Sequence, residues 1–123
     1  LMGEGEKPRA PGMKYRHYAP KAPVTVVLGE PSATADYIAA HLGEHTGVIC
    51  FDEWAGRFAG HVVENIGSAA RKDEQARRVF DALRAFDHTD VTEIYAQCPH
   101  EDGLGLAVAN RLKKAAGFHV VEV

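Results

Sequence analysis

The chain has 123 residues, 46% hydrophobic and 25% charged, a composition typical of one soluble globular domain. Its longest apolar run, Val24 to Leu28, is far shorter than the roughly 20 residues of a membrane-spanning helix, and no secretory signal pattern opens the chain. We therefore expect no membrane partner. Cys50 and Cys98 form no CxxC motif, which argues against a redox pair or zinc knuckle and favours a cytoplasmic protein.

The net charge of −3 combines two regions of opposite sign. Lys7 to Lys21 contains five Lys/Arg and no Asp/Glu, whereas Ala22 to Val123 contains 9 Lys/Arg and 15 Asp/Glu. A basic arm therefore precedes an acidic body. The acidic body argues against nucleic-acid binding through a broad basic face.

The arm contains the segment PGMKYRHYAP, residues 11–20, which does not resemble part of a fold. The prolines at its two ends disfavour helical geometry in the residues before them. Basic side chains with interleaved aromatic rings suit an anionic, flat ligand such as a nucleotide. The alternative is a solvated proline-rich linker with incidental charge. The side chains concerned are Lys14, Tyr15, Arg16, His17 and Tyr18.

Short apolar stretches alternate with amphipathic ones through the body. The expected strands are residues 24–28, 47–51, 61–67, 92–97 and 119–123. The first two are almost entirely apolar, as strands buried on both faces are. Strand–helix alternation with short connections predicts a Rossmann-like three-layer α/β/α domain with a five-stranded parallel sheet. We expect the spatial order 3-2-1-4-5, with the first strand central.

Three helices are expected, at residues 32–42, about 73–86 and about 103–116, because apolar residues recur there at helical spacing. Ser32 is the expected N-cap of the first helix, and Gly43 stands where that helix would stop. The expected apolar faces are Ala35, Ile38, Ala39 and Leu42; Ala76, Val79, Phe80 and Leu83; and Leu104, Val108, Leu112 and Ala115.

In open α/β sheets ligands bind beyond the carboxyl ends of the strands. The turn 29–31 after the first strand lacks GxGxxG, so no dinucleotide fingerprint is present. Gly103 and Gly105 open a helix and could let backbone N–H groups approach an anion. Glu101 and Asp102 precede them and would repel a phosphate, so acidic residues placed for the helix dipole are the favoured interpretation.

Metal-binding and catalytic motifs are not evident in the body. His41 and His45 have the i,i+4 spacing of two ligands on one helix face, but Gly43 between them is expected to end the helix. No HExxH or G-x-S-x-G motif is present. We therefore expect no metal site and no catalytic residue in this chain.

Three segments carry a resemblance to a known family: PGMKYRHYAP at 11–20, ARRVFDALR at 76–84 and EDGLGLAVANRLKKAAG at 101–117. Together they resemble the interdomain linker and Rossmann-like C-terminal domain of two-domain threonylcarbamoyl-AMP synthases, in which a YrdC-like catalytic domain comes first. The resemblance implies that residues 1–22 are an extended basic interdomain linker and 23–123 an accessory domain. Nothing in the chain resembles the catalytic domain, so it looks like a C-terminal fragment.

The resemblance also implies a function. The parent enzyme, a nucleotidyltransferase, would condense L-threonine, bicarbonate and ATP into threonylcarbamoyl-AMP and pyrophosphate, for threonylcarbamoyladenosine modification of tRNA. ATP and magnesium would bind the YrdC-like catalytic domain in cis, and this fragment alone would hold no cofactor and be inactive. Direct tRNA binding is not expected. A stand-alone Rossmann-like module that binds a small ligand without an enzyme partner is the alternative.

The candidate site residues lie in two places. As a lid on the catalytic cleft, the linker would contact ATP through Lys14, Tyr15, Arg16, His17 and Tyr18. A possible ligand edge of the sheet consists of Gly103, Gly105, Asn110 and Arg111. For Asn110 and Arg111 the sequence leaves both a binding role and surface packing open.

Overall fold

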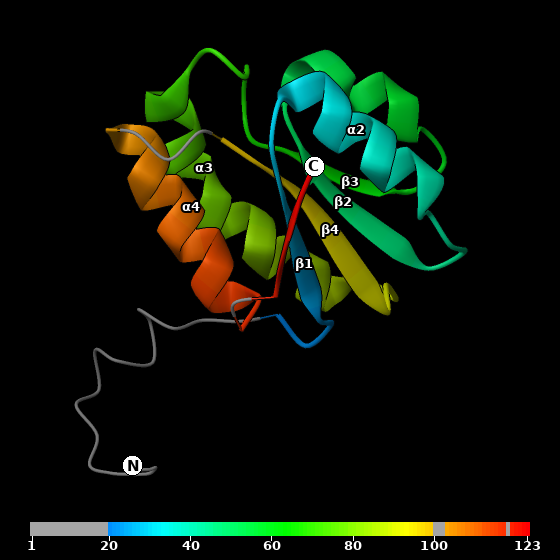
Figure 1. The fold of residues 1–123 in the computed structure, drawn as a ribbon. Helices are drawn as coiled ribbons and strands as arrows, with labels where there is room; N and C mark the ends of the chain where they lie inside the picture. Colours follow the sequence, from blue (N-terminus) through cyan, green and yellow to red (C-terminus); the bar gives the residue numbers. More distant parts are fainter. Residues whose placement is uncertain (1–19, 100–102, 118) are drawn as a thin grey trace, which may run out of the picture.

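Five parallel strands form one sheet in the computed structural model, which describes residues 20–99, 103–117 and 119–123. Helical segments connect successive strands (Figure 1). In chain order the elements are β1 (Val24–Leu28), α2 (Pro31–Ala40), β2 (Thr46–Cys50), the 3-10 helix η2 (Asp52–Phe58), β3 (Val62–Asn65), α3 (Lys72–Ala85), the 3-10 helix η3 (Phe86–His88), β4 (Glu93–Cys98), α4 (Leu104–Ala115) and β5 (Val120–Glu122). The predicted α/β class with a five-stranded parallel sheet is confirmed.

The predicted strand order is wrong. The observed order is β3-β2-β4-β1-β5, so β4 and not β1 is the central strand. Val26 of β1 lies opposite Ala96 of β4 on one side and Val120 of β5 on the other. The apolar pattern shows that a strand is buried on both faces, but β1 and β4 both have buried side chains on both faces. The burial pattern therefore could not decide which of the two is the central strand of the sheet.

Helices cover both faces of the sheet. In Figure 1, α3 and α4 lie together on one face, and α2 lies on the other. Successive residues of a strand point to opposite faces of the sheet, so adjacent residues belong to different hydrophobic core clusters. Val26 and Ile49 pack with Leu83 and Leu112 in the larger core cluster, under α3 and α4. Val27, Ile38, Val48 and Phe58 form the smaller cluster, under α2 and η2.

The N-cap of the first helix lies two residues earlier than predicted. Glu30, and not Ser32, is the N-cap, and Pro31 is the first helical residue. Proline suits this position because its fixed φ is already helical and its missing N–H has no intrahelical partner there. The helix ends at Ala40, before the predicted stop at Gly43.

The other two helices follow the predicted pattern closely. In α3, Val79 and Leu83 are buried while Phe80 is only half-buried. In α4, Val108, Leu112 and Ala115 are buried as expected. The predicted burial of the Leu104 side chain falls outside what the structure describes.

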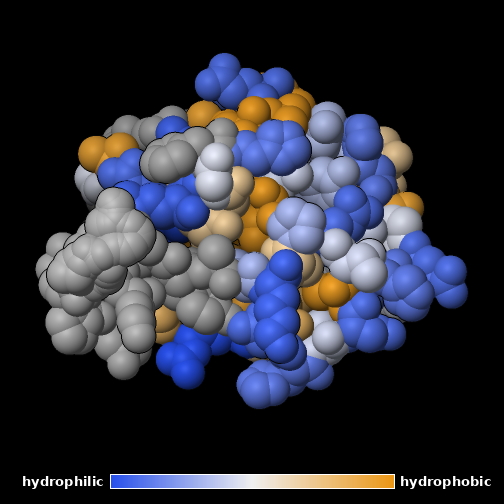
Figure 2. Space-filling view, turned by 90° about the horizontal axis from the view of Figure 1, so that it is seen from below, coloured by the Kyte–Doolittle hydropathy of each residue, from blue (hydrophilic) through white to orange (hydrophobic). Residues whose placement is uncertain are grey.

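The chain enters the sheet at the amino-terminal edge. Pro20 and Ala22 are buried, and Ala22 belongs to the core cluster under α3 and α4. The backbone N–H of Lys21 donates to Oδ1 of Asp87 in η3, at 3.1 Å. Figure 2 views the molecule from this end: hydrophilic residues cover much of it and hydrophobic ones show in separate patches. The carboxyl ends of the strands lie at the opposite end of the sheet.

Candidate functional site

The carboxyl end of β4 marks the place where an open α/β sheet would hold a ligand. The chain leaves β1 for α2 on one face and leaves β4 for α4 on the other face. Adjacent parallel strands whose connections diverge in this way leave a crevice beyond their carboxyl ends. The side chains near this crevice decide whether a ligand can enter.

Gln97 fills this place on the α2 side. Its side chain is fully buried, and its Oε1 accepts from the backbone N–H of Phe51 at 2.8 Å. Its Nε2 donates to the carbonyl oxygen of Pro31 at 3.0 Å and to Oγ1 of Thr34 at 3.1 Å. One amide therefore joins β4 to the end of β2 and to the first turn of α2. The sequence pattern places Gln97 only within a strand, although a single amide at an otherwise apolar strand end is a signal that could have singled it out.

The amino terminus of α2 is poorly suited to an anion. Its N-cap residue is the acidic Glu30, and Pro31 contributes no N–H to the first turn. Anion sites at helix ends need free backbone N–H groups and a positive local potential. The first turn of α2 is therefore poorly suited to bind a phosphate.

The end of β1 is also closely covered. The N–H of Val123 donates to the carbonyl oxygen of Leu28 at 3.0 Å. A Cβ atom on Gly29 would lie 2.7 Å from the Val123 carbonyl oxygen. Glycine is therefore required where β5 passes β1, and little space remains there for a ligand.

The predicted ligand-edge residues lie in two separate places. Gly103 is the N-cap of α4 with φ of 51°, and Gly105 is buried in the first turn. Asn110 and Arg111 are exposed and lie about two turns further along α4, roughly 10 Å from that end at 1.5 Å per residue. The four residues do not converge on one site. The acidic pair at 101 and 102 lies outside the described residues.

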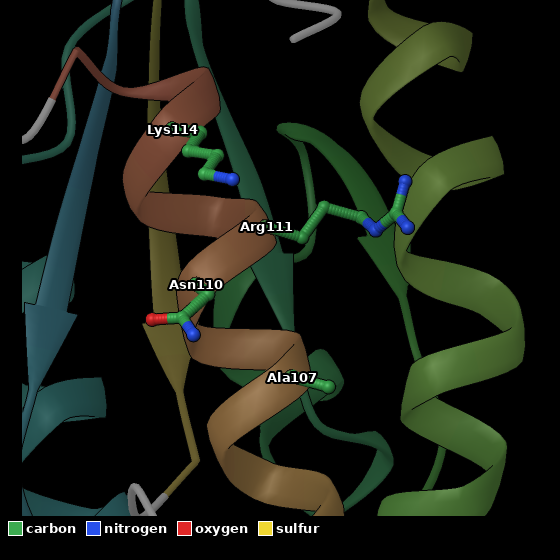
Figure 3. Close-up of a pocket in the computed structure, with 4 residues that line it drawn as sticks. All are labelled: Ala107, Asn110, Arg111 and Lys114. Carbon is green, nitrogen blue, oxygen red and sulfur yellow. The ribbon is translucent and has the colours of Figure 1, made fainter. Parts of the chain in front are cut away.

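The outer surface of α4 has its own hollow, of about 210 Å³, lined by Ala107, Asn110, Arg111 and Lys114. Figure 3 shows the Arg111 side chain reaching across from α4 toward α3, with the Lys114 amine pointing to the same side. The Arg111 guanidinium lies 5.2 Å from the centre of the Phe80 ring, and Arg84 lies 5.6 Å from the same ring. Two cations thus share one aromatic ring at the junction of the helices.

A cluster of polar side chains lies at the carboxyl ends of β2 and β3, and its members are hydrogen-bonded within the cluster. The Glu53 carboxylate accepts from the Ser68 hydroxyl at 2.5 Å and from the Ala69 N–H at 2.9 Å. The Ser68 hydrogen bond, followed by that from Ala69, lowers the pKa of Glu53. The Asn65 side-chain amide donates to Asp52 at 2.6 Å. These carboxylates hold loops together rather than face an open cavity.

Within the described residues, the titratable groups give little sign of pKa values shifted for catalysis. Burial, with a smaller effect from Asp52, raises the pKa of the Cys50 thiol to about 12, so it stays protonated near neutral pH. His41 stacks on Tyr37 and His45 lies 3.7 Å from Asp90, so the two imidazoles have separate partners. No cluster of three or more metal-ligating side chains occurs in residues 20–99, 103–117 and 119–123.

The predicted lid residues, Lys14, Tyr15, Arg16, His17 and Tyr18, lie outside the described residues. Within the part of the chain that is described, no helix is long and apolar enough to cross a membrane.

A family model described as "Threonylcarbamoyl-AMP synthase, C-terminal domain" matches residues 2–117. The chain belongs to this family. The match includes the basic arm and nearly all of the described body, so the resemblance carried by PGMKYRHYAP and the α4 segment is confirmed. The chain therefore corresponds to the C-terminal domain of threonylcarbamoyl-AMP synthases.

Relatives of this C-terminal domain come from three distant organisms. Threonylcarbamoyl-AMP synthase of Bacillus subtilis (strain 168) is 40% identical over 123 residues, covering 98% of this chain and 36% of the relative. The Pyrococcus abyssi enzyme is 41% identical over 121 residues, covering 94% of this chain and 34% of the relative. The Schizosaccharomyces pombe enzyme is 32% identical, covering 89% of this chain and 29% of the relative. The chain thus spans about a third of the length of these curated relatives.

Solved structures agree with the fold of this C-terminal domain. Pyrococcus abyssi Sua5 complexed with L-threonine has a TM-score of 0.63 and 39% identity, over 93% of this chain and 34% of that one. The C-terminal Sua5 domain of Pyrococcus horikoshii has a TM-score of 0.64 and 32% identity, over 85% of this chain and the whole of that one. The second structure is of the Pyrococcus horikoshii C-terminal Sua5 domain alone, so that domain folds without the rest of its protein.

Proposed function

We propose that residues 23–123 are the accessory domain of an enzyme that makes threonylcarbamoyl-AMP and pyrophosphate from L-threonine, bicarbonate and ATP, and that residues 1–22 are the linker to its catalytic domain. The extent of the family match carries this proposal: 98% of this chain matches the Bacillus subtilis relative but only 36% of that relative is covered. The uncovered part of the relative leaves room for a catalytic domain in cis. The product would serve tRNA modification, without direct tRNA binding by the acidic body.

The linker acts as a lid in this proposal. Lys14, Arg16 and the ring of Tyr18 can neutralise phosphate charge and stack on a base, and a tethered arm over a cleft keeps water from a reactive adenylate. Tyr15 and His17 complete the same segment. A structure of the Pyrococcus abyssi protein carries alanine in place of an adjacent histidine and tyrosine, and His17-Tyr18 is the single His-Tyr dipeptide of this chain.

ATP and magnesium would bind the catalytic domain, and this chain would hold no cofactor of its own. The buried Gln97 supports the accessory role, because it fills the place where a Rossmann-like domain would bind a nucleotide. The same observation disfavours the alternative of a stand-alone small-ligand module. Cys50 is a free, buried thiol, which suits a reducing compartment, and we propose the cytoplasm.

Pyrophosphate release from ATP, dependent on threonine and bicarbonate, tests this proposal in the full-length protein. The isolated chain should be inactive. Arg16→Ala should weaken ATP use about ten- to a hundredfold, since a charge-assisted bond is worth roughly 1.5–3 kcal/mol and each 1.4 kcal/mol is tenfold. Tyr18→Phe should cost less because the ring remains.

The isolated chain provides the control. Neither substitution should move its melting temperature, because the arm has no cleft to cover there. Unchanged ATP kinetics together with a destabilised chain would show that the arm belongs to this domain's core, and the lid would be refuted.

A further inference from the structure

The first described residues of the chain, 20–22, lie beside the carboxyl ends of α3 and α4. Ala22 packs in the core cluster that contains Phe86, after α3, and Ala115, at the end of α4. The Lys21 N–H is bonded to Asp87, also just after α3. Any domain joined to this end of the chain therefore starts near the carboxyl ends of these two helices.

Three exposed cations lie on the same two helices with no carboxylate partner among the described residues: Arg84, Arg111 and Lys114. The other arginines of α3 differ, since Arg77 lies 3.8 Å from Asp73 and Arg78 lies 3.6 Å from Glu74. Arg84 and Lys114 stand in the last turns of their helices. Positive charge is thus left uncompensated next to the point where the chain enters, although the body as a whole carries six more acidic than basic side chains (15 against 9).

These cations frame an apolar depression. Beside the hollow on α4 a smaller one, of about 90 Å³, is lined by Ala76, Val79, Ala107, Val108 and Arg111. Small alanines on both helices leave this space, and Arg111 lies at its border, against Phe80. We call the surface formed by Phe80, Arg84, Ala107, Arg111 and Lys114 the α3–α4 face. It offers shallow apolar space between cations.

We propose, on the basis of the proposed function, that the α3–α4 face docks on an acidic, partly apolar surface of the catalytic domain. The basic arm itself is a poor occupant, because its five cations would be repelled by those of the face. Interfaces between domains of one chain are small and polar, at about 600–1,500 Å², which suits this mixture of charge and apolar space. A short tether supplies an effective concentration in the millimolar range, so weak docking suffices.

Hydrogen exchange compares the full-length protein with the isolated 123-residue chain. Backbone amides of α4 (Leu104–Ala115) should exchange at least about threefold more slowly in the full-length protein. The double substitution Arg111→Glu, Lys114→Glu should abolish this protection, as should raising salt from about 0.05 to 0.5 M, because charges at a hydrated interface are screened. Arg57→Glu is the matched control: this exposed arginine of η2 pairs with Asp36 at 2.6 Å, under the other face of the sheet.

The outcomes separate the docking from the enzymatic function when pyrophosphate release is measured on the same samples. Activity with equal α4 exchange in both proteins overturns the docking alone. Protection without activity overturns the proposed function alone. Protection that survives the double substitution, or an isolated chain that sediments as a dimer with α4 already protected, also overturns the docking. If the double variant does not melt cooperatively, Lys114→Glu alone provides the same comparison.

Discussion

Replacing Gln97 by methionine should destabilise the domain more than the same replacement at Gln75. Both side chains are fully buried, and Gln97→Met nearly preserves volume while removing three hydrogen bonds. The largest loss is at Phe51, whose buried N–H would keep no acceptor, at about 1–3 kcal/mol. The Pro31 carbonyl oxygen would still accept from the Thr34 hydroxyl at 2.8 Å. We expect a total cost of about 2–3 kcal/mol.

Gln75 provides a control of equal size and burial. Its Nε2 donates to the Ser68 carbonyl oxygen at 2.8 Å, but its Oε1 is buried without a partner in the described structure. Gln75→Met removes one bond together with an unsatisfied oxygen, and the Arg71 N–H still donates to the Ser68 carbonyl at 3.0 Å. The two effects oppose each other, so the change should stay within about 1 kcal/mol.

Thermal melting of the 123-residue chain, followed by circular dichroism, measures both variants. For a domain of this size 1 kcal/mol corresponds to about 3–6 °C, so Gln97→Met should lower the melting temperature by about 6–18 °C. Equal shifts for the two variants would refute the reasoning, since they differ in hydrogen bonding and not in burial. So would a Gln97 variant that melts within about 2 °C of the unsubstituted chain.

Two further predictions concern stability. Gly47→Ala should cost about 1–3 kcal/mol, because its Cβ would lie 2.6 Å from the buried Phe86 ring, whereas Gly56→Ala, with nothing within 4 Å, should be nearly neutral in the same urea titration. Burial, opposed by Arg78, raises the pKa of Glu64 above its ordinary 4.5, so the folded state holds this proton more tightly and stability falls as pH rises through the raised pKa. Glu64→Gln should therefore gain in urea midpoint over the unsubstituted chain at pH 7 but not at pH 4; a gain of equal size at both pH values would exclude this titration as the cause.

The elements of the fold could be predicted from the sequence because local patterns carry them. The Val24–Leu28 strand and the Val79–Leu83 helix face follow from apolar spacing alone. The strand order could not be predicted in this way, since it depends on which buried strands pair across the sheet. The structure shows β4 in the centre with Gln97 bonded to α2, a long-range contact that no local pattern encodes.

The candidate site residues, like the fold, could be predicted from the sequence only in part. Asn110 and Arg111 belong to a segment that the sequence singled out, yet the Phe80 ring that Arg111 contacts, and the Arg84 that lies against the same ring, come from another helix. Only the packing of α3 on α4 brings these residues together. The amide of Gln97 was overlooked for the opposite reason, because a polar residue at a strand end indicates a ligand as readily as a structural bond.

The pairing of β1 with β5 affects how the domain would respond to mechanical force. The chain enters at the start of β1, and Val123 follows the end of β5, so these two points lie at opposite ends of adjacent parallel strands. Tension between them would run along the strands and load their hydrogen bonds simultaneously, including those from Val26 to His119 and from Val123 to Leu28, both 3.0 Å. Bonds loaded in shear must break together, whereas bonds peeled from one end break in succession. A pull on the residues that precede β1 would therefore load this pair of strands in shear rather than peel them apart.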